Sequence, residues 1–183
     1  MTRIRDAVEA VAEAIIKEKD YLNDLDAAIG DGDHGINMAR GLAAVMEAVD
    51  DMDDTTQPAP VLDMIGHTLL STVGGAAGPL YGNAFLAASK ACTENTRLNI
   101  TSIANVMAYA IAAIEKRGRS QRGEKTMLDV LIPIQECFLP ENSQDKTLFT
   151  CLGEAAKAAT DGLEYTKTII ATKGRASYVG ERS

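Results

Sequence analysis

Apolar residues recur every three or four positions along almost the whole chain, and this spacing constrains the fold more strongly than any other feature. That period places apolar side chains on one face of an α-helix, whereas a half-buried strand would need strict alternation, for which we find no convincing run. The spacing predicts seven helices in an all-α, antiparallel up-and-down bundle. In chain order, their apolar positions are Ile4, Val8, Val11, Ile15 and Leu22; Ala39, Leu42, Met46 and Val49; Leu62, Ile65 and Leu69; Tyr81, Phe85, Ala88 and Cys92; Ile103, Met107, Ala110 and Ile114; Met127, Leu131, Ile134 and Phe138; and Leu152, Ala155, Ala159, Leu163 and Thr166.

Glycine and proline residues indicate where these helices begin, end or weaken. We expect Pro79 to lie in the first turn of the fourth helix and Gly118 to cap the fifth. Pro133 falls inside the sixth helix, where it should remove a hydrogen bond and produce a kink. A length of 183 residues suits one domain, so we expect residues 1–183 to form a single helical domain.

Charge and cysteine content narrow the functional classes. The formal net charge is −8, and an acidic surface repels nucleic-acid phosphates and anionic lipid, so we expect neither nucleic acid nor membrane as a partner. The three cysteines, Cys92, Cys137 and Cys151, form no CxxC pair and are typical of reduced thiols in a cytoplasmic protein. No apolar run approaches the roughly 20 residues of a membrane span.

Four segments interrupt the helical pattern after the first, third, fifth and seventh helices. Alternate loops of an up-and-down bundle meet at the same end, so we expect all four to converge there. They are residues 24–37, 74–82, 118–127 and 173–183.

The first of these segments predicts a metal site. Four carboxylates within ten positions repel one another unless a cation lies among them, and interleaved glycines let the backbone fold tightly enough to gather them. Carboxylate oxygens suit Mg²⁺ or Ca²⁺. The alternative is a solvated acidic loop that caps the second helix. The acids are Asp24, Asp26, Asp31 and Asp33, and the glycines are Gly30, Gly32 and Gly35.

Two further observations on this segment refine the prediction of a metal site. An EF-hand counted from Asp31 would need an acid at Gly35 and a glutamate at Leu42, so the calcium motif is excluded. His34, beside Asp33, suits contact with a phosphate or the orientation of a carboxylate, although a lone histidine is more often structural.

The other segments offer groups that bind anions. Residues 73–82, VGGAAGPLYG, expose backbone N–H groups before a helix, which favours phosphate; close helix packing is the alternative. Neither a P-loop nor a dinucleotide-binding fingerprint is present. Basic residues in the last two segments are candidates for phosphate contact or partner docking, or are simply solvated. They are Arg117, Arg119, Arg122, Lys125, Lys173, Arg175 and Arg182.

Taken together, LDAAIGDGDHGINMARG, TVGGAAGPLYG, RGEKTMLDV and KGRASYVGERS resemble the L subunit of dihydroxyacetone kinase, which is also the ATP-binding domain of single-chain dihydroxyacetone kinases. The motifs occur in the family's order over residues 25–183. The resemblance implies a barrel of eight antiparallel helices, about seven of them present here, with ADP or ATP and two Mg²⁺ ions at one end.

The resemblance also implies roles for individual residues. Metal binding falls on Asp26, Asp31 and Asp33, and phosphate contact on His34, Gly35, Ile36 and Asn37. The glycine-rich phosphate loop matches Ala76 and Ala77, the adenine side matches Gly118 and Met127, and Arg175 matches an arginine at the phosphate end that stabilises charge on the transferring group.

Two departures from the family pattern stand out. Many relatives have a serine where this chain has Ala77, so contact there must come from backbone amides. The family continues past GERS with a DPG-containing loop and an eighth helix, which we expect residues 1–183 to lack.

The expected function follows from what the 183 residues provide. They leave no room for a substrate domain, which favours the three-subunit kinase: an M subunit donates from a phosphohistidine, and a K subunit presents dihydroxyacetone. Three alternatives remain open. They are an ATP-dependent kinase subunit for another small ketose or a fatty acid, a nucleotide-dependent regulator of a transcription factor, and a divalent-metal bundle without nucleotide.

Overall fold

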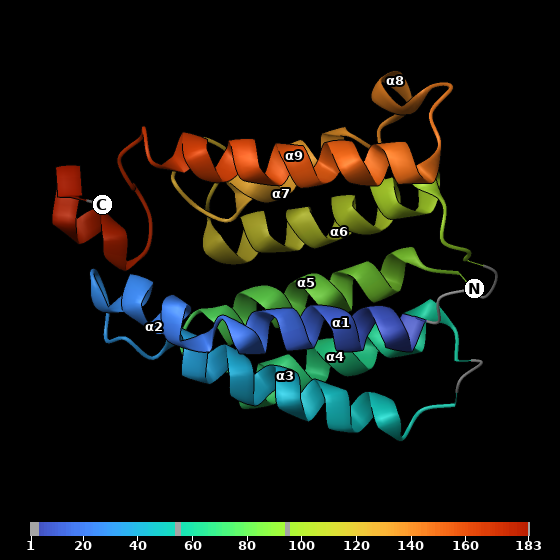
Figure 1. Ribbon diagram of the computed structural model, residues 1–183, viewed down its shortest axis with the longest axis horizontal. Coiled ribbons are helices and arrows are strands. Elements are labelled where there is room, and N and C mark those ends of the chain that lie inside the picture. The colour runs from blue at the N-terminus through green and yellow to red at the C-terminus, as the bar shows by residue number, and fades with distance from the viewer. Residues whose placement is uncertain (1–3, 54–55, 94–95, 183) are drawn as a thin grey trace. The chain divides into compact units, whose positions relative to one another are not determined.

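The computed structural model describes residues 4–53, 56–93 and 96–182, and the chain divides into two compact units, Met1–Glu94 and Asn95–Ser183. Helices account for all regular secondary structure in these described ranges (Figure 1), so the all-α prediction is confirmed. Successive long helices run antiparallel within each unit. The first unit contains α1 (Ile4–Lys17), α2 (Lys19–Ala27), α3 (His34–Asp50), α4 (Pro58–Thr72) and α5 (Ala77–Ala91); the second contains α6 (Ile100–Gly118), α7 (Leu128–Glu136), α8 (Pro140–Ser143), α9 (Leu148–Thr166) and the 3₁₀ segment η1 (Arg175–Arg182).

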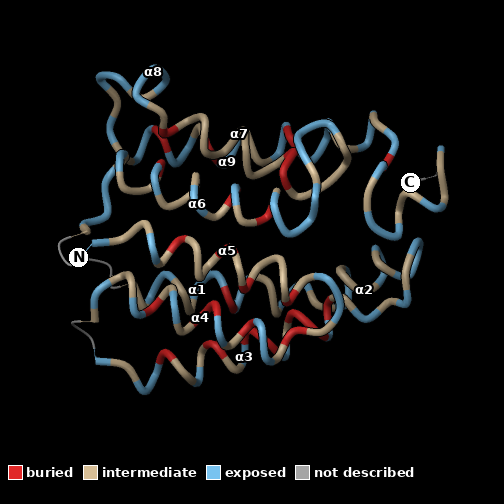
Figure 2. The backbone as a smooth tube through the Cα atoms, turned by 180° about the vertical axis from the view of Figure 1, so that it is seen from behind, coloured by how far each residue is buried: buried red, intermediate tan, exposed pale blue. Residues whose placement is uncertain are grey.

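The first unit packs around a continuous apolar core in which α3 and α4 contribute most of the buried side chains (Figure 2). Val45 and Leu69 are among the largest fully buried residues there. Gly66 and Gly82 let α4 and α5 approach closely, because an added Cβ at Gly82 would lie 2.9 Å from the Gly66 carbonyl oxygen. This packing holds the α2–α3 and α4–α5 loops at one end of the unit.

The predicted first helix is wrong in one respect, because the chain forms two helices, α1 and α2, where the periodicity predicted one. Val11 was expected on the buried face but is 58% exposed, and Ala12 is fully buried in its place. A small alanine suits the close approach of α1 to α3 better than the branched valine does.

Ends of other helices also differ from the predictions. Gly118 is the last residue of α6, and the left-handed capping position belongs to Arg119, with φ 48°. The fourth predicted helix corresponds to α5. It begins at Ala77, two residues before Pro79, so Pro79 lies in its first turn as predicted. The seventh predicted helix is α9, which ends at Thr166, and the terminal segment, for which no helix was predicted, contains η1.

The inner face of α9 was predicted only in part: Ala155 is buried as expected, but two predicted leucines are not. Leu152 and Leu163 are 48% and 53% exposed, whereas Cys151 and Gly162 are buried. An added Cβ at Gly162 would lie 2.5 Å from the Asp129 carbonyl oxygen on α7. Small residues therefore face α7 because its backbone approaches too closely for leucine.

Pro133 lies inside α7, as predicted. Because proline has no N–H, the Asp129 carbonyl loses its usual partner within the helix. That carbonyl is the group against which Gly162 packs.

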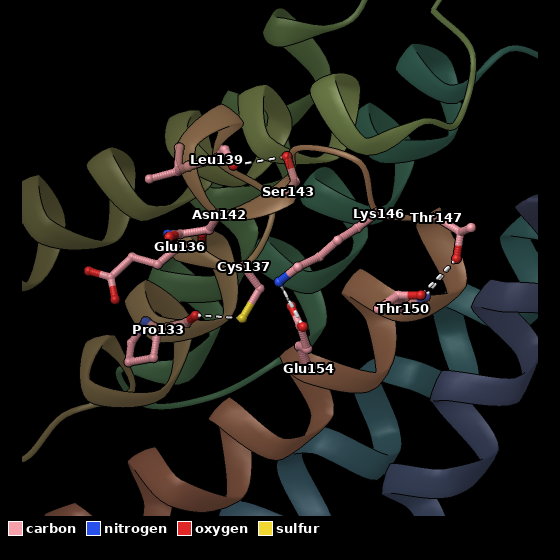
Figure 3. Close-up of polar contacts among 10 residues, drawn as sticks. All are labelled: Pro133, Glu136, Cys137, Leu139, Asn142, Ser143, Lys146, Thr147, Thr150 and Glu154. Carbon is pink, nitrogen blue, oxygen red and sulfur yellow. Dashed lines mark hydrogen bonds and ion pairs between the residues drawn. The ribbon is translucent and has the colours of Figure 1, made fainter.

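The α7–α9 connection forms the opposite end of the second unit from the 119–127 loop. Lys146 pairs with Glu154 at 2.7 Å, and the Cys137 thiol donates to the Pro133 carbonyl at 3.3 Å (Figure 3). Burial raises the pKa of the Cys137 thiol, so it stays protonated. All three cysteines are free thiols, in agreement with the prediction. Within the described ranges, no helix combines the length and apolarity needed to cross a lipid bilayer.

Candidate functional site

The loop between α2 and α3 gathers three carboxylates. Ligand oxygens of Asp26, Asp31 and Asp33 all lie within 4.8 Å of one another, whereas the exposed Asp24 is not part of this group. Two like charges 4 Å apart repel by about 1 kcal/mol in water and about 4 kcal/mol at an effective dielectric of 20. The three acids predicted as metal ligands are therefore brought together in an arrangement that favours a bound cation.

Backbone contacts hold this loop in shape. The Asp33 N–H donates to Asp26 Oδ2 at 3.0 Å, and the Gly30 N–H donates to the Asp26 carbonyl. An added Cβ at Gly30 would lie only 2.3 Å from Asp26 Oδ1, and Gly32 has a φ of +71°. These two glycines are required for different reasons, one for space beside a carboxylate and the other for backbone conformation.

Asp33 occupies the position before the first residue of α3, yet its side chain makes no capping hydrogen bond. Asn23 on α2 supplies the cap instead, because its Oδ1 accepts the Ile36 N–H at 3.1 Å. The two helices can approach because residue 35 is glycine; a Cβ there would lie 1.9 Å from the Lys19 carbonyl oxygen. The alternative of an acidic loop that caps its helix therefore does not describe Asp33.

The residues predicted to contact phosphate lie in the first turn of α3. His34 is half-buried, Gly35 and Asn37 are buried, and Ile36 is 51% exposed. This turn carries the partial positive charge of a helix N-terminus and lies next to Asp33 in the chain. Its position suits phosphate oxygens that share a cation with the carboxylates.

The predicted glycine-rich segment divides into two parts. Gly78 serves packing, because a Cβ there would lie 2.2 Å from the Val73 carbonyl oxygen. Gly75, by contrast, has a φ of +65° and open space around its Cβ position, and the neighbouring Ala76 is exposed. Ala77 begins α5. Close packing thus explains Gly78, while Gly75 and Ala76 form an exposed turn before α5 and Ala77 is partly buried against the core.

In the second unit, the loop between α6 and α7 is fixed by a buried carboxylate. Asp129 is 1% exposed, and its two oxygens accept the N–H groups of Gly123 and Thr126, the latter at 2.8 Å. The Thr126 hydroxyl in turn accepts the Leu128 N–H at 3.2 Å. Thr126 and Asp129 thus stabilise the turn that leads into α7, and only the Asp129 to Thr126 N–H half of a capping box is formed. This turn places Met127, half-buried, at the end of the loop that begins after the exposed Gly118.

The same loop is tied to the segment before Arg175. Glu124 accepts the Gln121 N–H at 2.8 Å and the Thr172 hydroxyl at 3.2 Å, and it lies 3.5 Å from Lys173 Nζ. The Gln121 hydrogen bond, with smaller contributions from Thr172 and Lys173, lowers the pKa of Glu124. The predicted adenine-side loop and the segment that leads to the exposed Arg175 therefore meet.

Besides Lys173, two of the predicted basic residues in the α6–α7 loop are engaged within this unit. Arg122 pairs with Glu136 at 2.8 Å, and Lys125 Nζ donates to the Ile169 carbonyl at 3.2 Å. Both contacts stabilise the loop itself. The side chain of Arg182 lies outside the described residues. Convergence of all four loops at one end of the whole chain stays a prediction, as does a single domain over residues 1–183.

A model of the DAK2 domain matches residues 28–183, which is most of the chain. The chain belongs to the DAK2 domain family.

The relatives that resemble this DAK2 domain in sequence are named as kinase subunits or as kinases. The ADP-binding subunit DhaL of PEP-dependent dihydroxyacetone kinase 1 from Listeria innocua is 45% identical over 93% of this chain and 80% of its own length. DhaL of the PTS-dependent kinase from Lactococcus lactis is 43% identical, with the same coverage. Triokinase/FMN cyclase from Homo sapiens is 33% identical over 94% of this chain but only 30% of its own length.

A solved structure shows the same fold. The crystal structure of the dihydroxyacetone kinase from C. freundii in complex with AMP-PNP and Mg²⁺ matches with a TM-score of 0.75 and 23% identity, covering 97% of this chain and 30% of that one.

Several residues that organise this DAK2 domain escaped the sequence analysis. Asn23 and Glu124 act through contacts that no local pattern encodes. Asp129 could have been found, because Thr126 and Asp129 form the T-x-x-D signature of a capping box before an apolar run.

Proposed function

We propose that this chain is the nucleotide-binding subunit of a dihydroxyacetone kinase and that Asp26, Asp31 and Asp33 hold a nucleotide through two magnesium ions. The observation that carries the proposal is the meeting of these three carboxylates on a loop whose following helix is capped by Asn23. The names of the relatives, which are ADP-binding subunits, support a nucleotide as ligand. The AMP-PNP and Mg²⁺ of the structural neighbour support it as well.

The carboxylate group fits magnesium. Mg²⁺ binds oxygen ligands at about 2.1 Å in octahedral geometry, so two ligands on one ion are at most about 4.2 Å apart. Ligand atoms that all lie within 4.8 Å of one another reach this geometry with small side-chain rotations, around one ion or two adjacent ions. Two ions match the charges better than one, because three carboxylates and an ADP of about −3 leave about −2 with two Mg²⁺ ions and about −4 with one.

The remaining predicted residues would bind the rest of the nucleotide. Amides in the first turns of α3 and α5, at His34 to Asn37 and at Ala76 to Ala77, suit phosphate oxygens. Gly118 and Met127 would lie on the adenine side, and the planar guanidinium of Arg175 suits a phosphoryl group during transfer. When bound, the magnesium nucleotide would relay a phosphoryl group from the phosphohistidine of the M subunit to dihydroxyacetone on the K subunit.

Sequence identity supports the three-subunit system over an ATP-dependent kinase for dihydroxyacetone or another small ketose. Relatives named as PEP- or PTS-dependent subunits are 38–45% identical to this chain. The triokinase relatives are 33% identical. We place the activity in the cytoplasm, where phosphohistidine donors and small-molecule acceptors meet.

The deciding experiment follows the nucleotide through turnover. The protein is loaded with labelled ADP and Mg²⁺, free nucleotide is removed, and the donor and acceptor subunits are added. The label should remain bound through many turnovers, because a retained coenzyme must dissociate slowly, and free ATP should not replace the donor. Loss of label within one turnover, with ATP alone sustaining the reaction, would identify an ATP-dependent kinase. Absence of Mg²⁺-dependent ADP binding would overturn the proposal.

A further inference from the structure

Arg40 connects two parts of the candidate site in the first unit. It lies one turn after Asn37 on α3, and its Nη2 donates to Asn37 Oδ1 at 2.7 Å. Its Nε donates to the Thr72 carbonyl at 3.0 Å. Thr72 is the last residue of α4, immediately before the turn that contains Gly75. A single guanidinium therefore joins the start of α3 to the end of α4.

The contact with Arg40 fixes which way the Asn37 amide faces. Arginine carries only donors, so it must face the amide oxygen, and this leaves the Asn37 NH₂ group as a donor for another partner. Asn37 is 8% exposed, and its amide lies against Gly74, where an added Cβ would be 3.1 Å from Oδ1 and 3.3 Å from Nδ2. The amide is thus held between a charged donor and a backbone without a side chain.

This orientation matters for an anionic ligand. Phosphate oxygens accept hydrogen bonds, so Asn37 can bind them only through its NH₂ group. A rotated amide would present its oxygen instead, which a phosphate repels. The Thr72 contact adds a second constraint, because it holds the end of α4 at a fixed distance from Asn37.

We infer that Arg40 is a positioning residue that fixes the Asn37 amide in the orientation required for nucleotide phosphate. This inference rests on the proposed function. Arg40 acts through Asn37, so the removal of either residue should weaken binding, and the removal of both should be no worse than the removal of Asn37 alone.

A double-mutant cycle tests the inference. Affinity for ADP with Mg²⁺ is measured by calorimetry for R40A, N37A and the double variant, with urea unfolding as a measure of stability. We expect R40A to bind ADP about tenfold more weakly. This is about the cost of one lost hydrogen bond between the Asn37 amide and a charged phosphate. The double variant should match N37A. R5A is the control, because Arg5 also joins two helices of this unit, through Glu9 and Asp50, outside the phosphate-contact residues.

Other outcomes contradict the inference in distinct ways. Unchanged affinity in R40A overturns it. Additive losses in the double variant mean that Arg40 acts independently of Asn37, either through Thr72 or by direct contact with the ligand. Full affinity in R40K means that charge alone suffices, since an ammonium lacks the planar fork that joins both acceptors.

A measurement without nucleotide separates this inference from the proposed function. The side-chain NH₂ signals of Asn37, assigned by their absence in N37A, should shift in R40A and stay unchanged in R5A. Unchanged signals in R40A would overturn the positioning role even if the wild-type protein binds ADP. Failure of wild-type binding together with shifted signals would overturn the nucleotide site and leave the amide contact intact.

Discussion

The backbone N–H of Asp33 donates to the side chain of Asp26 across 3.0 Å, so two of the three clustered aspartates are joined by a hydrogen bond that involves no metal. The acceptor is Oδ2 of Asp26. The Asp33 carboxylate takes no part in this hydrogen bond and belongs to the cluster. Backbone hydrogen bonds therefore contribute to the shape of the loop, and substitutions at the acids should change ligand binding more than folding.

Asp31→Asn and Asp33→Asn should each abolish Mg²⁺-dependent ADP binding while the helix content stays that of the wild type. Each substitution removes one ligand charge from the cluster. Calorimetry measures the affinity, and circular dichroism measures the helix content. Asp24→Asn is the matched control, because Asp24 is an exposed acid of the same segment outside the cluster. Normal affinity in either cluster variant would refute the metal assignment.

Gly30→Ala should weaken metal binding about tenfold with little loss of stability, at the low end of effects seen for groups that orient metal ligands. The new Cβ would meet Asp26 Oδ1 at 2.3 Å, and a side chain rotates away more readily than backbone moves. Mg²⁺ titration and urea unfolding separate the two effects. Gly153→Ala on α9, with open space at its Cβ position, provides the control. A large fall in stability with unchanged Mg²⁺ affinity would contradict this explanation.

Asp129→Asn should destabilise the second unit by about 1–3 kcal/mol, because a buried N–H loses its acceptor and faces an amide NH₂ group. The substituted side chain has one acceptor oxygen, whereas the carboxylate serves both Gly123 and Thr126. Urea unfolding measures the loss of stability. Amide hydrogen exchange at Gly123 and Thr126 should accelerate more than exchange in the middle of α9. Uniform acceleration would instead indicate global unfolding.

The contact between Glu124 and Thr172 should weaken in acid. The pKa of Glu124 is lowered on folding, so its stabilising effect is complete above the ordinary value of about 4.3 and is lost as pH falls through the folded value. The Thr172 amide resonance should therefore titrate below pH of about 4.3 and not between pH 5 and 7. Glu124→Gln should remove this titration. A midpoint above the ordinary value would contradict the direction of the shift.

Arg175→Ala should slow phosphoryl transfer far more than it weakens ADP binding. A guanidinium at the phosphate end stabilises charge that develops during transfer, which adds little to the affinity for ADP. Turnover with the donor and acceptor subunits gives the rate, and calorimetry gives the affinity. Equal losses of both would make Arg175 an ordinary binding residue.

The sequence by itself determined the helical class, the position of Pro133 within its helix and the acidic segment that contains the cluster. These features depend on local spacing: apolar residues at helical intervals, and four acids interleaved with glycines. The resemblance to the kinase family selected Asp26, Asp31 and Asp33 among the four. Such short-range patterns have the same consequence wherever the segment lies in the fold.

Only the tertiary structure decided which residues support that site and which faces are buried. Asn23 caps α3 from α2, and Arg40 reaches Thr72, thirty-two residues away, because helix packing brings these groups together. The buried face of α9 presents Cys151 and Gly162, whereas the predicted Leu152 and Leu163 are exposed. The physical reason is close approach: where two backbones nearly touch, the smallest side chains face inward, and hydrophobicity alone does not predict that choice.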